Sequence, residues 1–274
     1  MTRAQHRRLG LALVLAFLAI AAMTLGRGGL YMARHEGDAL HLMQIVLLEA
    51  RGWRPHVDIE TPIGILATAP MALFVRLGLG FGHAFLAAQA LVAALLLPAI
   101  WHVAGSRLRG LSAWIFSGFT LLLCMALVNG QTETGLSVSM HYNRWAWALA
   151  YVALALAVLK PLAGGVAGRL DGAIVGLAMT ALALVKITYF VAFAPAVVLA
   201  LLAHRAFGAL AWAVMAGLAL AAVVTFWAGG LGFWLAYAGD LLTVAHTPLR
   251  KAPGLPFGEM LVAPAYLGAS AVLV

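Results

Sequence analysis

The sequence predicts an all-α membrane protein: a polytopic bundle of transmembrane helices with an interfacial helix in its first outer loop. Hydrophobic residues make up 64% of the 274 residues, charged residues only 9%, and the mean hydropathy is +1.00. This composition is far more apolar than that of a soluble domain. Apolar runs close to the ~20 residues that a membrane span needs also recur along the chain. We therefore expect a single transmembrane domain over residues 1–274.

The basic balance of the chain fits the same class. Seventeen Lys and Arg residues against nine acidic residues give a formal net charge of +8. In a soluble protein this excess would suggest nucleic acid as a partner, but in membrane proteins Arg and Lys gather in cytoplasmic loops and set orientation. We therefore expect a lipid bilayer and no nucleic acid. The single cysteine, Cys124, lies in an apolar run and excludes a disulfide framework and a thiolate metal cluster.

The first expected helix covers residues 9–25 and follows a short basic segment with three arginines. A cleaved signal peptide has a similar order of charge and apolar residues, but no small-x-small cleavage site follows this run, and its length suits a membrane span. We interpret it as a retained helix with a cytoplasmic N-terminus. The loop that follows, residues 26–61, then lies outside.

This outer loop and the residues just after it are unusually acidic. Residues 34–64 hold five of the nine acidic residues in the chain, and charge at a membrane is costly unless it is paired, solvated or used. Glu36 and Asp38 precede apolar residues at helical spacing, which predict an amphipathic helix on the membrane surface, closed by Gly52. Asp38 has two interpretations: a catalytic carboxylate, or a residue that stabilises the helix start by ~1 kcal/mol.

The next two apolar segments cover residues 62–80 and 85–103, and Arg107 and Arg109 follow the second. If both segments crossed the membrane, these arginines would lie outside, against the positive-inside rule. We therefore expect the shorter segment, 62–80, which Arg76 interrupts, to be re-entrant or only to dip into the bilayer.

Two further helices are expected on either side of a polar loop. Residues 111–128 form the first, the loop covers residues 129–144, and Trp145 and Trp147 open the second helix, as tryptophans at a membrane interface do. The loop contains Gln131, Glu133, His141, Tyr142, Asn143 and Arg144.

The apolar run over residues 174–202 is too long for one span of ~20 residues and predicts two tightly joined helices. Lys186 then lies at the outer end of both, either as a functional cation or as a side chain that snorkels to the interface. A helix over 210–228 and a loop over 229–259 with Asp240 follow. The last apolar segment stops at Val274 without a polar tail, so we expect further helices, and a soluble domain, to complete the protein.

The polar stretches are expected to converge on the outer face, where they suit group transfer. A carboxylate at a wet membrane surface can deprotonate a hydroxyl or amine, and Arg or Lys can neutralise a phosphate leaving group. The signatures of P-loop NTPases, HExxH zinc proteases and GxSxG hydrolases are absent from the sequence. The candidate site residues are Glu36, Asp38, Arg54, Asp58, Glu60, His141, Arg144 and Lys186.

Several of these residues lie in short motifs that follow one another in a recognisable order. These are the pair Glu36-Gly37-Asp38, GWRPHVDIETPIG at 52–64, HYNRWAW at 141–147 and GLAMTALALVKITYF at 176–190. The ordered set resembles the GT-C superfamily of integral membrane glycosyltransferases, and within it the bacterial branch close to the aminoarabinose and protein-mannosyl transferases. The resemblance covers essentially the whole chain. It departs from the family pattern at residues 61–63, which read Thr-Pro-Ile where Pro-Pro-Leu is frequent.

The resemblance implies an inverting transfer of a sugar from a polyprenyl-phosphate donor to a glycan, lipid or protein acceptor. The site would face the periplasm from the bacterial inner membrane, and the chain would be the N-terminal part of the bundle. Carried over residue by residue, Asp38 is the base, Glu36 its neighbour and Lys186 a contact of the donor phosphate. Acceptor recognition in this superfamily generally lies in later loops or a C-terminal domain.

The remaining candidates have alternatives that the sequence leaves open. Asp58, Glu60 and Arg54 either line the site or are solvated loop charges, and His141 and Arg144 either contact substrate or anchor a helix start. His35, His41 and His56 lie near the carboxylates and leave room for a divalent metal, but their spacing does not define a metal site.

Two other functions compete with the enzyme. A transporter or flippase of lipid-linked sugars would also need polar residues among apolar helices, but such proteins tend to show internal repeats and charges near the bilayer midplane. Here the acidic residues lie at helix ends and in loops, and the two halves show no repeat. A bundle partner without chemistry of its own is the third interpretation.

Overall fold

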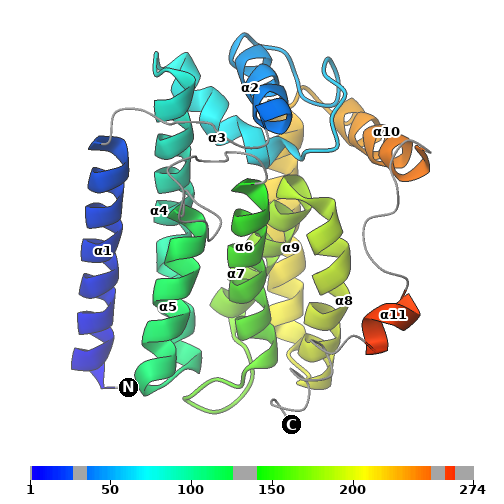
Figure 1. Ribbon diagram of the computed structural model, residues 1–274. Helices are drawn as coiled ribbons and strands as arrows, with labels where there is room; N and C mark the ends of the chain where they lie inside the picture. Colours follow the sequence, from blue (N-terminus) through cyan, green and yellow to red (C-terminus); the bar gives the residue numbers. More distant parts are fainter. Residues whose placement is uncertain (1, 27–35, 126–140, 248–256, 263–274) are drawn as a thin grey trace.

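The computed structural model describes residues 2–26, 36–125, 141–247 and 257–262, and these residues are helical apart from turns and short loops. An upright bundle and a layer of helices across one end make up the fold (Figure 1). The bundle consists of α1 (Arg3–Gly26), α4 (Phe81–Arg107), α5 (Gly110–Met125), α6 (His141–Val158), α7 (Arg169–Val185), α8 (Ile187–Ala203) and α9 (Phe207–Trp227). Across the end lie α2 (Glu36–Ala50), α3 (Ile65–Arg76) and α10 (Gly232–His246), while the short α11 (Phe257–Val262) lies beside the bundle.

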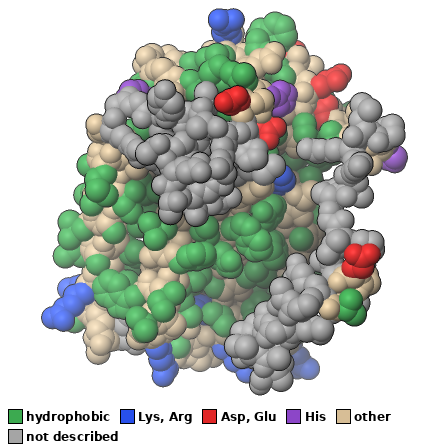
Figure 2. Space-filling view, in the orientation of Figure 1, with side chains coloured by type: hydrophobic (Ala, Val, Ile, Leu, Met, Phe, Trp, Pro, Cys, Tyr) green, Lys and Arg blue, Asp and Glu red, His purple; other side chains and the backbone are tan. Residues whose placement is uncertain are grey.

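We call the end with α2, α3 and α10 the upper end, and the opposite end, with the N-terminus and the turns after α4, α6 and α8, the lower end (Figure 1). Figure 2 shows hydrophobic side chains over the middle of the visible face, most of the visible Lys and Arg side chains along the lower rim, and acidic and His side chains mainly above. This separation is what the positive-inside rule requires of a chain whose lower end faces the cytoplasm. The orientation itself stays a prediction.

Among the described residues, three helices are long and apolar enough to cross a membrane: Ala4–Gly26, Phe81–Arg107 and Phe207–Trp227. Shorter apolar helices include Gly110–Met125 and Ile187–Ala203. These helices support a membrane protein whose apolar surface contacts lipid, because much of each helix stays outside the protein core and its apolar side chains suit hydrocarbon.

The helices α7 and α9 pack closely because small residues face one another. A Cβ atom on Gly172 would collide with the carbonyl of Ala209, and one on Gly176 with the carbonyl of Ala213. The four-residue spacing places each pair on one helix face. Such small-xxx-small contacts let backbones approach in a membrane, where lipid removes the hydrophobic drive for helix association.

The expected division of the run 174–202 is confirmed. The α-helix stops at Val185, Lys186 takes an extended conformation with φ −157° and ψ 103°, and α8 starts at Ile187. Lys186 therefore lies at the junction of α7 and α8, as expected, and this junction is at the upper end of the bundle (Figure 1).

The helix α3 keeps to the upper end. It has 12 residues, about 18 Å at 1.5 Å per residue, which is too short for ~30 Å of hydrocarbon. It begins where Gly64 packs against the carbonyl of Leu184, and it ends at the turn into α4, also at the upper end (Figure 1). The segment 62–80 therefore does not cross the bundle.

Three boundaries differ from the sequence-based expectation. The first outer helix already begins at Glu36, so the acidic pair lies within its first turn. The helix α6 begins at His141, so residues 141–144 are helical, while the rest of the expected loop, residues 129–140, lies outside the described residues. Residues 229–259, expected as a loop, contain α10, because Phe233 and Tyr237 bury one face of that segment against Ile65 and Leu184.

Candidate functional site

The acidic pair lies on the open side of α2. Glu36 and Asp38 are both exposed, in the first turn of the helix. The next residue, Ala39, is fully buried in a cluster with Leu42 and Trp145, so the opposite face of α2 holds the helix in place. A carboxylate in a first turn gains from the helix dipole, and an exposed one can also reach a substrate in water. Both interpretations of Asp38 therefore remain consistent with its position.

A third acid of the same helix, Glu49, is buried. It follows Leu42 by seven residues and Val46 by three, so it continues the apolar stripe that packs against α3. The residue is only 2% exposed. Sequence reasoning did not single out Glu49, although the helical spacing of the apolar residues, extended to residue 49, puts this carboxylate on the buried face.

The carboxyl group of Glu49 has no hydrogen-bond partner for either oxygen among the described residues. The nearby hydroxyl of Thr68 is directed to the carbonyl of Ile65 at 3.3 Å, and it has only one proton to donate. Burial raises the pKa of Glu49 to about 7, although the Thr68 hydroxyl and the charge of Arg76 lower it. Glu49 can therefore gain and lose a proton near neutral pH, as general acids and bases do.

Arg76 joins the ends of α2 and α3. Its Nη2 donates to the carbonyl of Glu49 and its Nε to the carbonyl of Ala50 at 3.2 Å. These carbonyls end α2 and lack partners within the helix, and a cation there also interacts favourably with the helix dipole. The guanidinium of Arg76 is thus already engaged by backbone acceptors.

The loop after α2 carries a second engaged arginine. Arg54 Nε lies 3.0 Å from Asp58 Oδ2 and Nη2 lies 3.3 Å from Oδ1, in a fork-shaped pair near the surface. This hydrogen bonding lowers the pKa of the Asp58 carboxyl. Nη1 of Arg54 lies close to Gly229, where a Cβ would come within 2.9 Å of it. Glu60, from the same loop, is exposed.

Glu49, Arg54 and Arg76 border one pocket of ≈ 240 Å³. The pocket lies at the upper end, between the end of α2, the helix α3 and the turn from α9 to α10. Trp53 from the loop and Trp227 from α9 complete its walls. We call this the Glu49 pocket.

A buried pair fixes the same loop to α10. His56 Nδ1 and Asp240 Oδ2 are 2.8 Å apart, and the backbone N–H of Thr61 donates to the same oxygen at 3.0 Å. The ring of His56 packs against Tyr237 with 4.4 Å between centroids. Burial lowers the pKa of His56, and the Asp240 hydrogen bond opposes this effect. The sequence indicated both residues as outer polar groups but not that they pair.

The other cationic candidates gather at the start of α6 and at the break between α7 and α8. The buried His141 has Nε2 3.0 Å from the carbonyl of Ala67 in α3, and Lys186 Nζ lies 4.7 Å from the ring centroid of Tyr142. Arg144, one turn into α6, is partly buried. The helix α3 contacts both α6 and α7, and its residues Ile65 and Arg76 also line the Glu49 pocket.

The structure does not bring all the candidate residues to one point. Asp38 and Glu49 are eleven positions apart (49 minus 38) on one helix, which is about 16 Å along its axis. They can act at two ends of an extended substrate but not on one atom. His35 and Glu133 lie outside the described residues, and within the described part no group of three His, Cys, Asp or Glu side chains is arranged to hold a metal ion.

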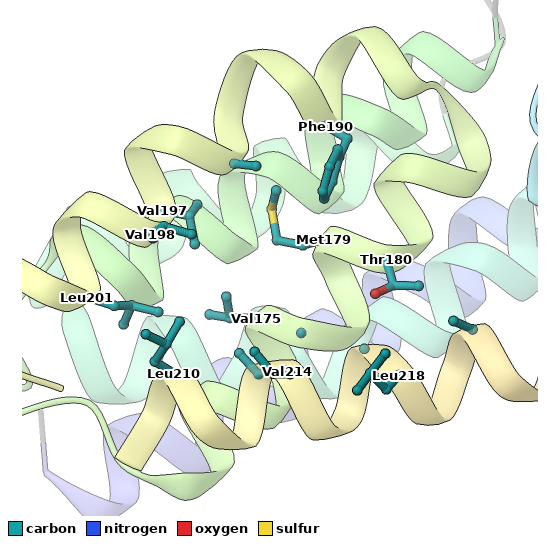
Figure 3. A pocket seen from close by; sticks show the side chains of 15 residues that line it. Val175, Met179, Thr180, Phe190, Val197, Val198, Leu201, Leu210, Val214 and Leu218 are labelled. Atoms are coloured by element: carbon teal, nitrogen blue, oxygen red, sulfur yellow. The ribbon is translucent and has the colours of Figure 1, made fainter. Parts of the chain in front are cut away.

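Two other features have a structural explanation. An apolar pocket of ≈ 300 Å³ lies between α7, α8 and α9 (Figure 3), and Thr180 is the one polar side chain in its described lining. It suits hydrocarbon and offers no reactive group. At the lower end Asp171 accepts from Arg107 Nη2 at 2.8 Å and lies 2.7 Å from His102 Nε2. This network neutralises an arginine whose side chain is 1% exposed.

Comparison of the chain with models of protein families, with curated proteins and with solved structures found no match.

Proposed function

We propose that the chain is an integral membrane glycosyltransferase of the GT-C type, acting at the periplasmic face of the bacterial inner membrane. It would move a sugar from a polyprenyl-phosphate donor to a glycan, lipid or protein acceptor in an inverting step. The observation that carries the proposal is the gathering of carboxylates, cations and tryptophans at the upper end of an apolar helical structure. A lipid-linked donor and the polar reacting group of an acceptor meet at such a boundary.

In this proposal Asp38 acts as the base. The acceptor hydroxyl or amine attacks the anomeric carbon, its proton passes to the Asp38 carboxylate, and the lipid phosphate leaves with the electron pair of the broken C–O bond. The exposed position of Asp38 in the first turn of α2 gives an acceptor access from water. Glu36, exposed beside it, would position the acceptor.

Lys186 would stabilise the leaving phosphate. Its place at the upper ends of α7 and α8 puts a cation beside the apolar helices, where the phosphate of a membrane-bound donor lies. Cations at the position where charge develops stabilise a transition state strongly when water is excluded. Arg144 and His141, on the neighbouring helix, would help to bind the same donor.

The position of the acids favours an enzyme over a transporter of lipid-linked sugars. Carriers place charged residues near the bilayer midplane. Among the described residues, Glu259 lies in α11 beside the bundle, and the other acids lie at the ends of the bundle or in the layer above it: Glu36, Asp38, Glu49, Asp58, Glu60, Asp171 and Asp240. Binding of a lipid-linked sugar without transfer would instead support the transporter.

The test is sugar transfer from polyprenyl-phosphate donors by the full-length protein in nanodiscs. Asp38→Asn keeps the size and the capping oxygen but cannot accept the proton, so we expect a loss of ~10²–10⁴-fold in rate with an unchanged thermal unfolding curve. Glu36→Gln should lose less. Asp58→Asn and Glu60→Gln are the matched variants in the same outer segment. If one of them is silent while Asp38→Asn is fully active, the base lies in the loop and not on α2.

The role of Lys186 has its own test in the same assay. Lys186→Ala should raise the donor KM and lower the rate, whereas Lys160→Ala, an exposed lysine at the lower end, should change neither. If Lys186→Ala leaves the donor KM and the rate unchanged, Lys186 does not contact the donor and is an interfacial side chain without a role in transfer.

A further inference from the structure

We propose that the Glu49 pocket binds one uncharged sugar ring, with the buried carboxyl group of Glu49 turning toward the ring to accept hydrogen bonds from neighbouring hydroxyl groups. This inference rests on the proposed function and adds a second carbohydrate site to it, at the opposite end of α2 from Asp38. The sugar can belong to the donor or to the acceptor, since both present hydroxyl pairs.

The first observation is the unused hydrogen-bonding capacity of Glu49. Within the described part of the chain, both oxygens of this 2% exposed residue lack hydrogen-bond partners. The neighbouring Thr68 hydroxyl donates to a carbonyl of its own helix and Arg76 donates to the end of α2, although both groups still lower the pKa of the Glu49 carboxyl. A buried polar group without a partner destabilises a fold. Such groups are retained where a ligand supplies the missing hydrogen bonds. Two adjacent carboxylate oxygens can accept from two adjacent hydroxyl groups.

The charges around the pocket select a neutral ligand. A phosphate would meet the carboxylate of Glu49, and both guanidinium groups already have acceptors, Arg54 in Asp58 and Arg76 in backbone carbonyls. An ammonium group would be repelled by the same two arginines. A polyhydroxylated ring avoids both conflicts because it brings donors and acceptors without net charge.

The size and the walls of the pocket agree with a single ring. Its ≈ 240 Å³ correspond to roughly eight waters at ~30 Å³ each, which is room for one monosaccharide unit and not for a chain. Trp53 and Trp227 come from separate elements and leave about half of their surface exposed, 50% and 45%. Indole faces of this kind can pack against the C–H groups of a sugar while a few placed polar groups orient it.

The distance between Asp38 and the Glu49 pocket indicates the role of the pocket. About 16 Å of helix separates the two carboxylates, so a ring in the Glu49 pocket is not the ring or hydroxyl that reacts at Asp38. The pocket would hold a remote sugar of an extended substrate and thereby select it. If Glu49 itself lies at the reacting centre, its variants must abolish transfer and Asp38→Asn must not.

The binding test uses saturation-transfer NMR with a panel of methyl glycopyranosides and the full chain in detergent. Wild type should transfer saturation to the ring protons of at least one glycoside. Glu49→Gln, which keeps the shape of the residue, should weaken that binding about tenfold to a hundredfold, because hydrogen bonds to a charged acceptor are the stronger ones. Trp227→Leu should weaken it as well. Trp212→Leu, in the lower half of the same helix α9, and Glu259→Gln, an exposed acid outside the pocket, should bind as wild type.

The outcomes distinguish the proposed sugar site from the proposed transfer reaction. Absence of saturation transfer from every glycoside in wild type, or equal binding in Glu49→Gln, overturns the sugar site and leaves the transfer reaction standing. Glycoside binding that depends on Glu49, together with no transfer by wild type, supports the pocket and removes the proposed enzyme. Where transfer occurs, the substrate whose KM rises in Glu49→Gln, the donor or the acceptor, identifies the source of the ring.

Discussion

Glu49 should make the stability of the protein depend on pH in a direction opposite to that of a salt-bridged acid. Its pKa in the folded chain is raised from the ordinary 4.5 to about 7 because the carboxyl is buried, and the Thr68 hydroxyl and the charge of Arg76 offset this effect only in part. Between these two pH values the folded protein holds a proton that the unfolded chain has released. The free energy of unfolding therefore falls as pH rises through this window, and the full stability is present only below the unfolded pKa.

The size of the effect follows from the two pKa values. A difference of one pH unit corresponds to about 1.4 kcal/mol, so a shift from 4.5 to about 7 corresponds to about 3 kcal/mol lost by pH 7 and above. Glu49→Gln keeps the volume and removes the titration. We expect the variant to match wild type at acid pH and to be more stable than wild type by about 3 kcal/mol at pH 8.

The assay is thermal unfolding of wild type and Glu49→Gln in the same detergent, from about pH 4 to about pH 8, covering both pKa values. Every other group titrates in both proteins, so the difference between the two unfolding midpoints isolates Glu49. A Gln variant that is less stable than wild type at pH 8, or a difference that does not change with pH, would refute the reasoning. It would mean that the carboxylate is paired or hydrated in the folded protein.

Three further predictions concern the frame of the site. Asp171→Ala leaves Arg107 buried without its partner and should cost ~3–5 kcal/mol of stability; a thermal midpoint within error of wild type would contradict the buried pair. Gly176→Ala should destabilise the protein by ~1–3 kcal/mol because its Cβ collides with α9. Its control, Gly118→Ala, has open space around the added Cβ and should be neutral or slightly stabilising. Equal thermal unfolding curves for these two variants would disprove the close approach of α7 and α9. In a cysteine-free background, a cysteine at Arg109 should be protected from an impermeant reagent in whole cells and one at Glu36 should react; the reverse would invert the orientation.

The sequence was sufficient for the parts of the fold that depend on each segment alone. Apolar runs predicted most of the bundle helices to within a few residues, and the length of the run 174–202 predicted the break at Lys186. This works because a helix in hydrocarbon must satisfy its backbone internally and cover its length with apolar side chains, and both requirements are local. The same reasoning missed α10, whose helix depends on burying Phe233 and Tyr237 against other elements.

The pairing of polar residues, by contrast, was decided only by the tertiary structure. His56 meets Asp240 from 184 positions away, and Arg107 meets Asp171. Glu49 has no hydrogen-bond partner among the described residues, and the walls of its pocket come from α2, the loop after it, α3 and α9. Periodicity tells which face of a helix is buried, but not which face of another helix covers it. The burial and the charges that set the pKa of Glu49 depend on that second fact, so the site acquires its chemical character only when the helices pack.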